Sequence, residues 1–85
     1  MYKIVFTRQA SKSFQKLPQH VAVQIREKLA QVAIDPFAQH PFVTKLQNRP
    51  GYRLRAGDWR VIYDLQKEEL MILVLKIASR GEVYR

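Results

Sequence analysis

The spacing of apolar and polar residues changes twice along this chain, and each change predicts a different secondary structure. Residues 2–6 alternate and are rich in β-branched and aromatic side chains, which predicts a strand. Residues 7–34 then carry apolar side chains at every third or fourth position, which predicts helices. From residue 52 onward the alternation returns and predicts further strands.

Prolines set the limits of the helical region. Thr7 is a suitable N-cap for a first short helix, and Pro18 ends that helix and can occupy the first turn of the next. The pair Asp35–Pro36 ends the second helix. We therefore expect a helical hairpin whose apolar stripes cover one face of a sheet.

The segment after the helices has no periodicity. Residues 36–50 contain three of the four prolines, so we expect a connector there. Phe37, Phe42 and Leu46 are its expected anchors in the core.

The remainder predicts a meander. Residues 52–55 and 59–65 form the arms of a hairpin, and the almost continuously apolar residues 70–78 predict a strand that is buried on both sides. Residues 82–84 would add a short final strand or form a tail. The expected fold class is α+β, in the order β-α-α-β-β-β with an optional fifth strand. Residues 1–85 would form one domain, in which the helical hairpin covers one face of an antiparallel sheet.

Positive charge is the main global feature of the chain. Fifteen Lys and Arg against seven Asp and Glu give a net charge of +8, which attracts polyanions. Most arginines lie in the strand-like half, whereas a membrane-surface binder would concentrate its basic residues on one amphipathic helix. The chain has no cysteine, no metal-ligand motif and no apolar run long enough to span a bilayer, and nothing in it resembles a signal peptide. We expect a cytoplasmic protein without metal or cofactor that binds nucleic acid or an acidic protein.

The parity of the strands brings several arginines to one surface. Arg53 and Arg55 share a face of their strand, and Arg60 lies on the partner strand. Arg80 and Tyr84 follow the central strand, where a turn could bring them to the same surface. A guanidinium is planar, permanently charged and matched to phosphate oxygens, so the group predicts an anion site.

The same residues carry a family resemblance. Residues 53–63, the preceding Lys45–Leu46 and the ending Arg80–Tyr84 resemble the signature blocks of the RelE/ParE toxin superfamily of prokaryotic toxin–antitoxin systems. The match covers essentially the whole chain. Members of that superfamily include ribosome-dependent endoribonucleases that cut mRNA in the decoding site, and relatives that inhibit DNA gyrase instead. Both kinds are normally held inactive by a co-encoded antitoxin.

The resemblance implies a set of functional residues. The expected catalytic residues are Arg53, Arg60, Arg80 and Tyr84, and the expected further RNA contacts are Lys45, Arg49 and Arg55. The chain departs from the family at Gly51, where some RelE proteins carry a lysine. Arg49 or Arg55 could supply that charge, or the activity could be weaker. The implied partners are an acidic, partly disordered antitoxin, mRNA on the ribosome, and operator DNA through the antitoxin complex, with no membrane.

The proposed chemistry assigns a role to each catalytic residue. In metal-independent RNA cleavage the 2′-hydroxyl attacks the adjacent phosphate and the 5′-oxygen leaves. Arginines can stabilise the charged phosphorane, but they stay protonated and remove the 2′ proton poorly. We therefore assign Arg60 and Arg80 to phosphate charge, and Arg53 to charge or leaving-group contact. Tyr84 is assigned to proton transfer.

Two other functions remain open. A ParE-like gyrase inhibitor would have the same fold without the chemistry, and an inactive partner would bind only its antitoxin and operator DNA. Simpler structural roles are also available, because Arg55 could be a solvated surface residue and Arg60 could pair with Asp58 or Asp64.

Overall fold

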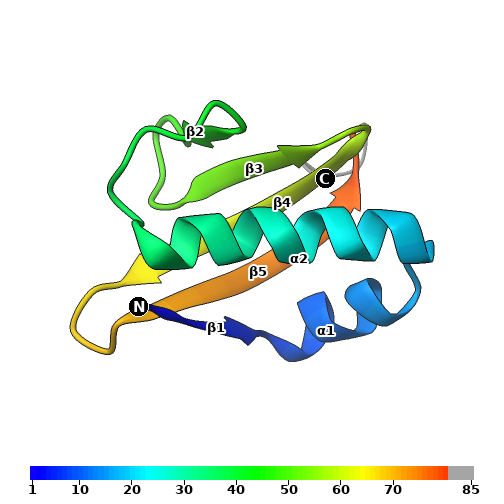
Figure 1. The fold of residues 1–85 in the computed structure, drawn as a ribbon, viewed down its shortest axis with the longest axis horizontal. Coiled ribbons are helices and arrows are strands. Elements are labelled where there is room, and N and C mark those ends of the chain that lie inside the picture. Colours follow the sequence, from blue (N-terminus) through cyan, green and yellow to red (C-terminus); the bar gives the residue numbers. More distant parts are fainter. Residues whose placement is uncertain (81–85) are drawn as a thin grey trace.

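The structure is a computed structural model that describes residues 1–80 (Figure 1). Its elements are β1 (Lys3–Phe6), α1 (Arg8–Gln15), α2 (Gln19–Ile34), β2 (Val43–Lys45), β3 (Tyr52–Ala56), β4 (Trp59–Gln66) and β5 (Met71–Ser79). The predicted α+β class is confirmed. The optional strand at 82–84 lies outside the described residues.

The two helices begin and end where the sequence predicts. Thr7 caps α1, since its Oγ1 accepts a hydrogen bond from the backbone N–H of Ala10 at 3.1 Å. Pro18 precedes the first residue of α2, and Asp35 follows its last. These local signals define the limits of the two helices.

The sheet is mixed, so the prediction of a purely antiparallel sheet was wrong. The strand order is β1-β5-β4-β3-β2, and β1 runs parallel to β5 while the other neighbours are antiparallel. The backbone N–H groups of Lys3 and Thr7 donate to the carbonyls of Leu70 and Val74, each at 2.9 Å. A meander pattern describes only consecutive strands, whereas β1 pairs with a strand almost seventy positions away.

The connector contains a strand that the sequence analysis missed. Val43–Lys45 forms β2 and pairs with β3, with Thr44 opposite Arg53. Three residues between prolines are too few to show a period of two. Beyond β2, the backbone N–H of Leu46 donates to the carbonyl of Gly51 at 3.0 Å and closes the loop between the two strands.

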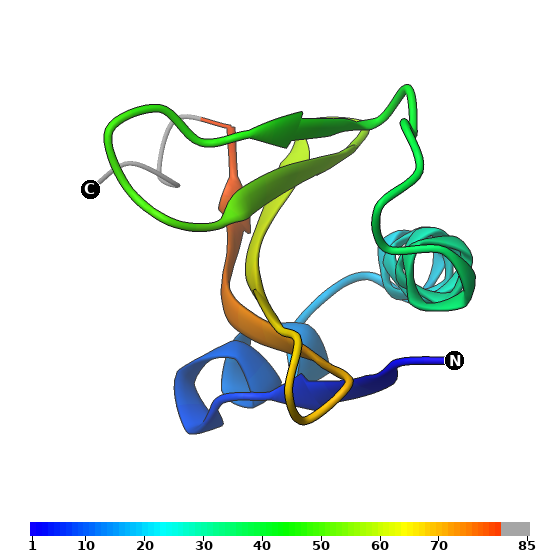
Figure 2. The ribbon, with the colours of Figure 1, turned by 90° about the vertical axis from the view of Figure 1, so that its left-hand side faces the viewer.

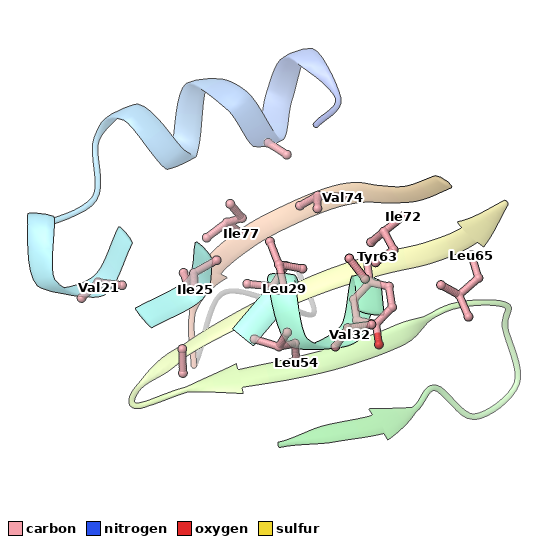
Figure 3. Packing of buried hydrophobic residues seen from close by; sticks show 14 residues of the cluster. Val21, Ile25, Leu29, Val32, Leu54, Tyr63, Leu65, Ile72, Val74 and Ile77 are labelled. Atoms are coloured by element: carbon pink, nitrogen blue, oxygen red, sulfur yellow. The ribbon is translucent and has the colours of Figure 1, made fainter. Parts of the chain in front are cut away.

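One buried cluster holds the helices to the sheet (Figure 3). Figure 2 shows α2 alongside the sheet, seen nearly along the helix axis. The α2 stripe contributes the residues that its spacing predicts, which are Val21, Ile25, Leu29 and Val32. The sheet contributes alternate residues of β3, β4 and β5, among them Leu54, Val61, Tyr63 and Ile72. Residues of opposite parity therefore lie on the other face of the sheet, which we call the outer face.

Candidate functional site

Four arginines from three separate segments line one hollow on the outer face, which we call the arginine pocket. Its volume is about 300 Å³, and its lining residues are Pro41, Phe42, Thr44, Arg53, Arg55, Arg60 and Arg80. Figure 1 shows the β3–β4 turn and the end of β5 at the same end of the sheet. The expected convergence of arginines is thus present in the structure.

Strand register explains this convergence. Arg55 lies directly opposite Arg60 in the β3–β4 pair, and Arg60 lies opposite Ala78 in the β4–β5 pair. Two residues beyond Ala78, the backbone N–H of Arg80 donates to the carbonyl of Asp58 at 2.7 Å. This hydrogen bond holds Arg80 against the β3–β4 turn, beside the arginines of the hairpin.

Main-chain carbonyls orient the side chain of Arg60. Its Nη1 donates to the carbonyls of Gly57 at 2.8 Å and Trp59 at 3.0 Å. The carboxylate of Asp64 accepts hydrogen bonds from the backbone N–H of Leu65 and from Nε2 of Gln66. In the described residues, the side chain of Arg60 thus bonds to main-chain carbonyls, whereas the sequence suggested an ion pair with Asp58 or Asp64.

The arginine pocket concentrates charge of one sign. Arg53 and Arg60 are half-buried, whereas Arg55 and Arg80 are exposed. Like charges directly opposite each other on neighbouring strands are destabilising, as at Arg55 and Arg60. None of the described residues that line the pocket is acidic. A bound anion would relieve this repulsion, and guanidinium forks are suited to phosphate oxygens.

The core holds a tyrosine that cannot serve as a base. Burial raises the pKa of Tyr63 well above its usual value, and the neighbouring Tyr52 raises it further. The two rings stack with their centroids 5.4 Å apart. Tyr63 therefore stays a neutral phenol on the core face. Tyr84 lies outside the described residues, so its position beside the arginines stays a prediction.

A second hollow adjoins the arginine pocket, and we call it the loop pocket. It has a volume of about 350 Å³ and is lined by Thr44, Lys45, Leu46, Gln47, Arg49 and Arg53. Thr44 and Arg53 line both pockets. Two of the expected RNA contacts, Lys45 and Arg49, thus lie beside the arginine pocket, and the third, Arg55, lines it.

The glycine at position 51, where the resemblance implies a lysine in some RelE proteins, fits the local backbone. Its backbone φ of +111° lies in a region that side-chain-bearing residues rarely adopt. A Cβ there would lie 3.1 Å from the carbonyl oxygen of Tyr63 and 3.4 Å from Cδ1 of Leu46. This backbone therefore requires glycine at position 51, and the positive charge of this region comes from residues around it.

Three residues that line the arginine pocket were not among the site residues expected from the sequence. Pro41 and Thr44 carried no chemical signal, and Phe42 was expected only as a core anchor. The ring of Phe42 is half-buried and lies 5.2 Å from Nζ of Lys28, which also donates to the carbonyl of Arg55 at 3.0 Å. Phe42 lies directly before β2 and packs against the buried cluster, as expected of a core anchor, so it contributes to both the core and the pocket.

Two negative findings apply to the described part of the chain. Within residues 1–80, no group of three or more His, Asp or Glu could hold a metal ion. No helix of that part is long and apolar enough to cross a bilayer.

Comparison with known proteins identifies the class. A family model described as the ParE toxin of type II toxin–antitoxin system, parDE, matches residues 4–84. The chain belongs to this family of toxins, within the RelE/ParE superfamily.

Proteins named RelE are among the relatives that resemble this chain in sequence and in structure. The chain is 28% identical over 88 residues to the mRNA interferase toxin RelE of Escherichia coli strain K12, covering 98% of this chain and 90% of that protein. The crystal structure of the isolated E. coli RelE toxin superposes with a TM-score of 0.83 at 27% identity, covering 99% and 92% of the two chains. The archaeal RelE–RelB complex from Pyrococcus horikoshii OT3 gives a TM-score of 0.80 at 30% identity, covering 96% and 98%.

Proposed function

We propose that this toxin is a ribosome-dependent endoribonuclease that cleaves translated mRNA. The observation that carries the proposal is the arginine pocket, where four guanidiniums from three segments surround a space suited to one backbone phosphate. The relatives named mRNA interferase RelE support the same activity. Because guanidiniums supply the positive charge, the proposed mechanism uses no metal.

The proposed reaction is a transesterification within the RNA strand. The 2′-oxygen forms a bond to the adjacent phosphorus, and the bond from phosphorus to the 5′-oxygen breaks. Arg60 and Arg80 stabilise the charge on the phosphoryl oxygens, and Arg53 contacts the phosphate or the leaving oxygen. Tyr84 is assigned to take the 2′ proton, and water supplies the proton that the leaving 5′-oxygen gains.

Dependence on the ribosome follows from the weakness of this site. A phenol is a poor base at neutral pH, and two of the four arginines, Arg55 and Arg80, are exposed and place a flexible strand only loosely. A ribosome that holds the strand in a reactive geometry would supply the missing orientation. The substrate is therefore mRNA in a translating ribosome, and the compartment is the cytoplasm.

The proposed partner in the resting state is a cognate antitoxin. Solved complexes pair E. coli RelE with RelB and the P. horikoshii RelE with its own RelB. A net charge of +8 favours an acidic, partly disordered chain that folds on binding. The toxin would reach operator DNA only through that complex.

Gyrase inhibition is the second candidate function, because the matching family is described as the ParE toxin. In that case the pocket would bind an anionic surface and carry out no chemistry.

Induced expression with mapping of transcript 5′ ends, alongside a gyrase supercoiling assay, separates the two candidates. New ends confined to translated regions are expected, with supercoiling unchanged. Loss of supercoiling with intact transcripts would overturn the nuclease proposal and select gyrase.

A further inference from the structure

The loop pocket differs in chemistry from the arginine pocket beside it. Two of its lining residues are Leu46, which is half-buried, and Gln47, which is exposed. An aliphatic surface next to an amide suits a flat, partly apolar ring with polar edges. Its volume of about 350 Å³ lies at the small end of the range for ligand sites, about 300–1,000 Å³.

The loop that forms this pocket has a defined backbone. The hydrogen bond between the N–H of Leu46 and the carbonyl of Gly51 closes it, and Asn48 adopts a left-handed conformation with φ of 64°. Gly51 is buried against the backbone of Tyr63. A loop with a fixed backbone presents the side chain of Gln47 from a constant position. Such preorganisation favours discrimination between similar ligands.

The two pockets are joined through shared residues. Arg53 and Thr44 lie opposite each other on β3 and β2 and line both hollows. The loop pocket is therefore the hollow next to a phosphate bound by the arginines, and Lys45 and Arg49 in its lining provide positive charge for a neighbouring phosphate.

We propose that the loop pocket holds the base of the nucleotide next to the cleaved bond, and that Gln47 reads the edge of that base. The proposal rests on the nuclease function proposed above. Proteins read single-stranded RNA by hydrogen bonds to the edges of unstacked bases. The side-chain amide of glutamine matches the donor and acceptor of adenine, so adenine is the expected base.

Cleavage rates on ribosomes programmed with a set of matched messages test this assignment. The messages carry each of the four bases in turn at the positions on either side of the cut. The full-length toxin is compared with Gln47→Leu, which keeps the size of the side chain and removes its hydrogen bonds. Gln31→Leu, at an exposed position of α2, is the matched control.

The wild-type toxin should prefer adenine at one flanking position by roughly 5- to 150-fold, the discrimination expected of one bidentate amide–base pair. Gln47→Leu should bring that ratio close to one and leave the ratio at the other position unchanged. Gln31→Leu should keep both ratios.

A Gln47→Leu toxin that keeps the wild-type preference would overturn the assignment, and so would a wild-type toxin without adenine preference at either position. Both results leave the nuclease function standing. A wild-type toxin that cuts no message overturns the proposed function itself, and this inference with it.

Discussion

The two faces of the sheet are built from adjacent residues and differ in almost every property. Leu54 and Val61 point into the buried cluster and are both 0% exposed. Their sequence neighbours Arg53, Arg55 and Arg60 line the arginine pocket on the outer face. The strand period of two separates burial from charge at each step. Stability and activity are therefore expected to respond to different substitutions, even at consecutive positions.

Ile62 is the exception on the outer face. It is only 6% exposed, yet it lies outside the main buried cluster. Its cross-strand neighbours are Arg53 and Lys76, whose long side chains have apolar stems that can cover it. At Ile62 the outer face therefore has a buried apolar side chain beneath its charged ones. The two faces differ less in burial at this position than elsewhere.

The largest expected effect separates two tyrosines. Tyr84→Phe should slow cleavage by about 10²- to 10⁴-fold while RNA binding persists, because the residue is assigned to proton transfer. Tyr63→Phe, on the core face, should leave the cleavage rate of the folded protein unchanged. Single-turnover cleavage and a binding titration measure both. Equal rates for Tyr84→Phe and the wild type would remove Tyr84 from the mechanism.

A core substitution tests the other face. Leu54→Ala should lower the free energy of unfolding by about 2–5 kcal/mol, since it empties a fully buried site. Lys45→Ala, exposed on β2, should change it by less than about 0.5 kcal/mol. Urea unfolding gives both values. Similar losses for the two variants would mean that burial does not distinguish the faces.

Arg80→Ala should lower cleavage by about 10²- to 10³-fold and abolish growth arrest, because it removes one donor to the transition state. The melting temperature should stay close to that of the wild type, as expected at an exposed position. Arg8→Ala, exposed on α1, is the control of equal charge and should remain toxic. If Arg80→Ala arrests growth as well as Arg8→Ala does, Arg80 has no place in the site.

Two glycines with positive φ should respond differently to alanine. Gly51→Ala should cost about 1–3 kcal/mol, because φ of +111° is strained for alanine and the added Cβ meets the carbonyl of Tyr63. Gly57→Ala should cost about 1 kcal/mol, because its φ of +60° is left-handed but nothing lies within 4 Å of the added atom. Thermal unfolding compares the stability losses of the two variants. A larger loss for Gly57→Ala than for Gly51→Ala would contradict the close approach of the added Cβ to the carbonyl of Tyr63.

The smallest expected effect is a gain in stability. Arg55→Gln removes one of two like charges that face each other across β3 and β4 and should stabilise the fold by about 0.2–1 kcal/mol at low salt. The gain should shrink as salt rises, since the charge is exposed. Unfolding at two salt concentrations measures it. A loss of stability at low salt would show that the pair is not repulsive.

Local signals explain how much of the fold the sequence could predict. The cap at Thr7, the break at Pro18 and the apolar spacing of α2 depend on neighbouring residues, and all three are confirmed. The parallel contact of β1 depends on a strand far along the chain, and β2 is too short to show a pattern. Long-range pairing and very short strands carry little local information.

The candidate site follows the same division. Alternation placed Arg53, Arg55 and Arg60 together, and the structure adds Arg80 through one backbone hydrogen bond. The contribution of Phe42 required the position of β2, which was not predicted. At Gly51 the sequence showed a missing charge, whereas the backbone shows a conformational requirement.

The parallel contact between β1 and β5 also determines when the molecule can assemble during its own synthesis. β5 lies between β1 and β4, so neither can complete its hydrogen bonds until residues 71–79 have emerged from the translating ribosome. Arg80 follows directly, so the arginine pocket would be completed later still. Under the proposed function, a growing chain that has not yet reached Arg80 lacks the complete arginine pocket and is expected to be inactive.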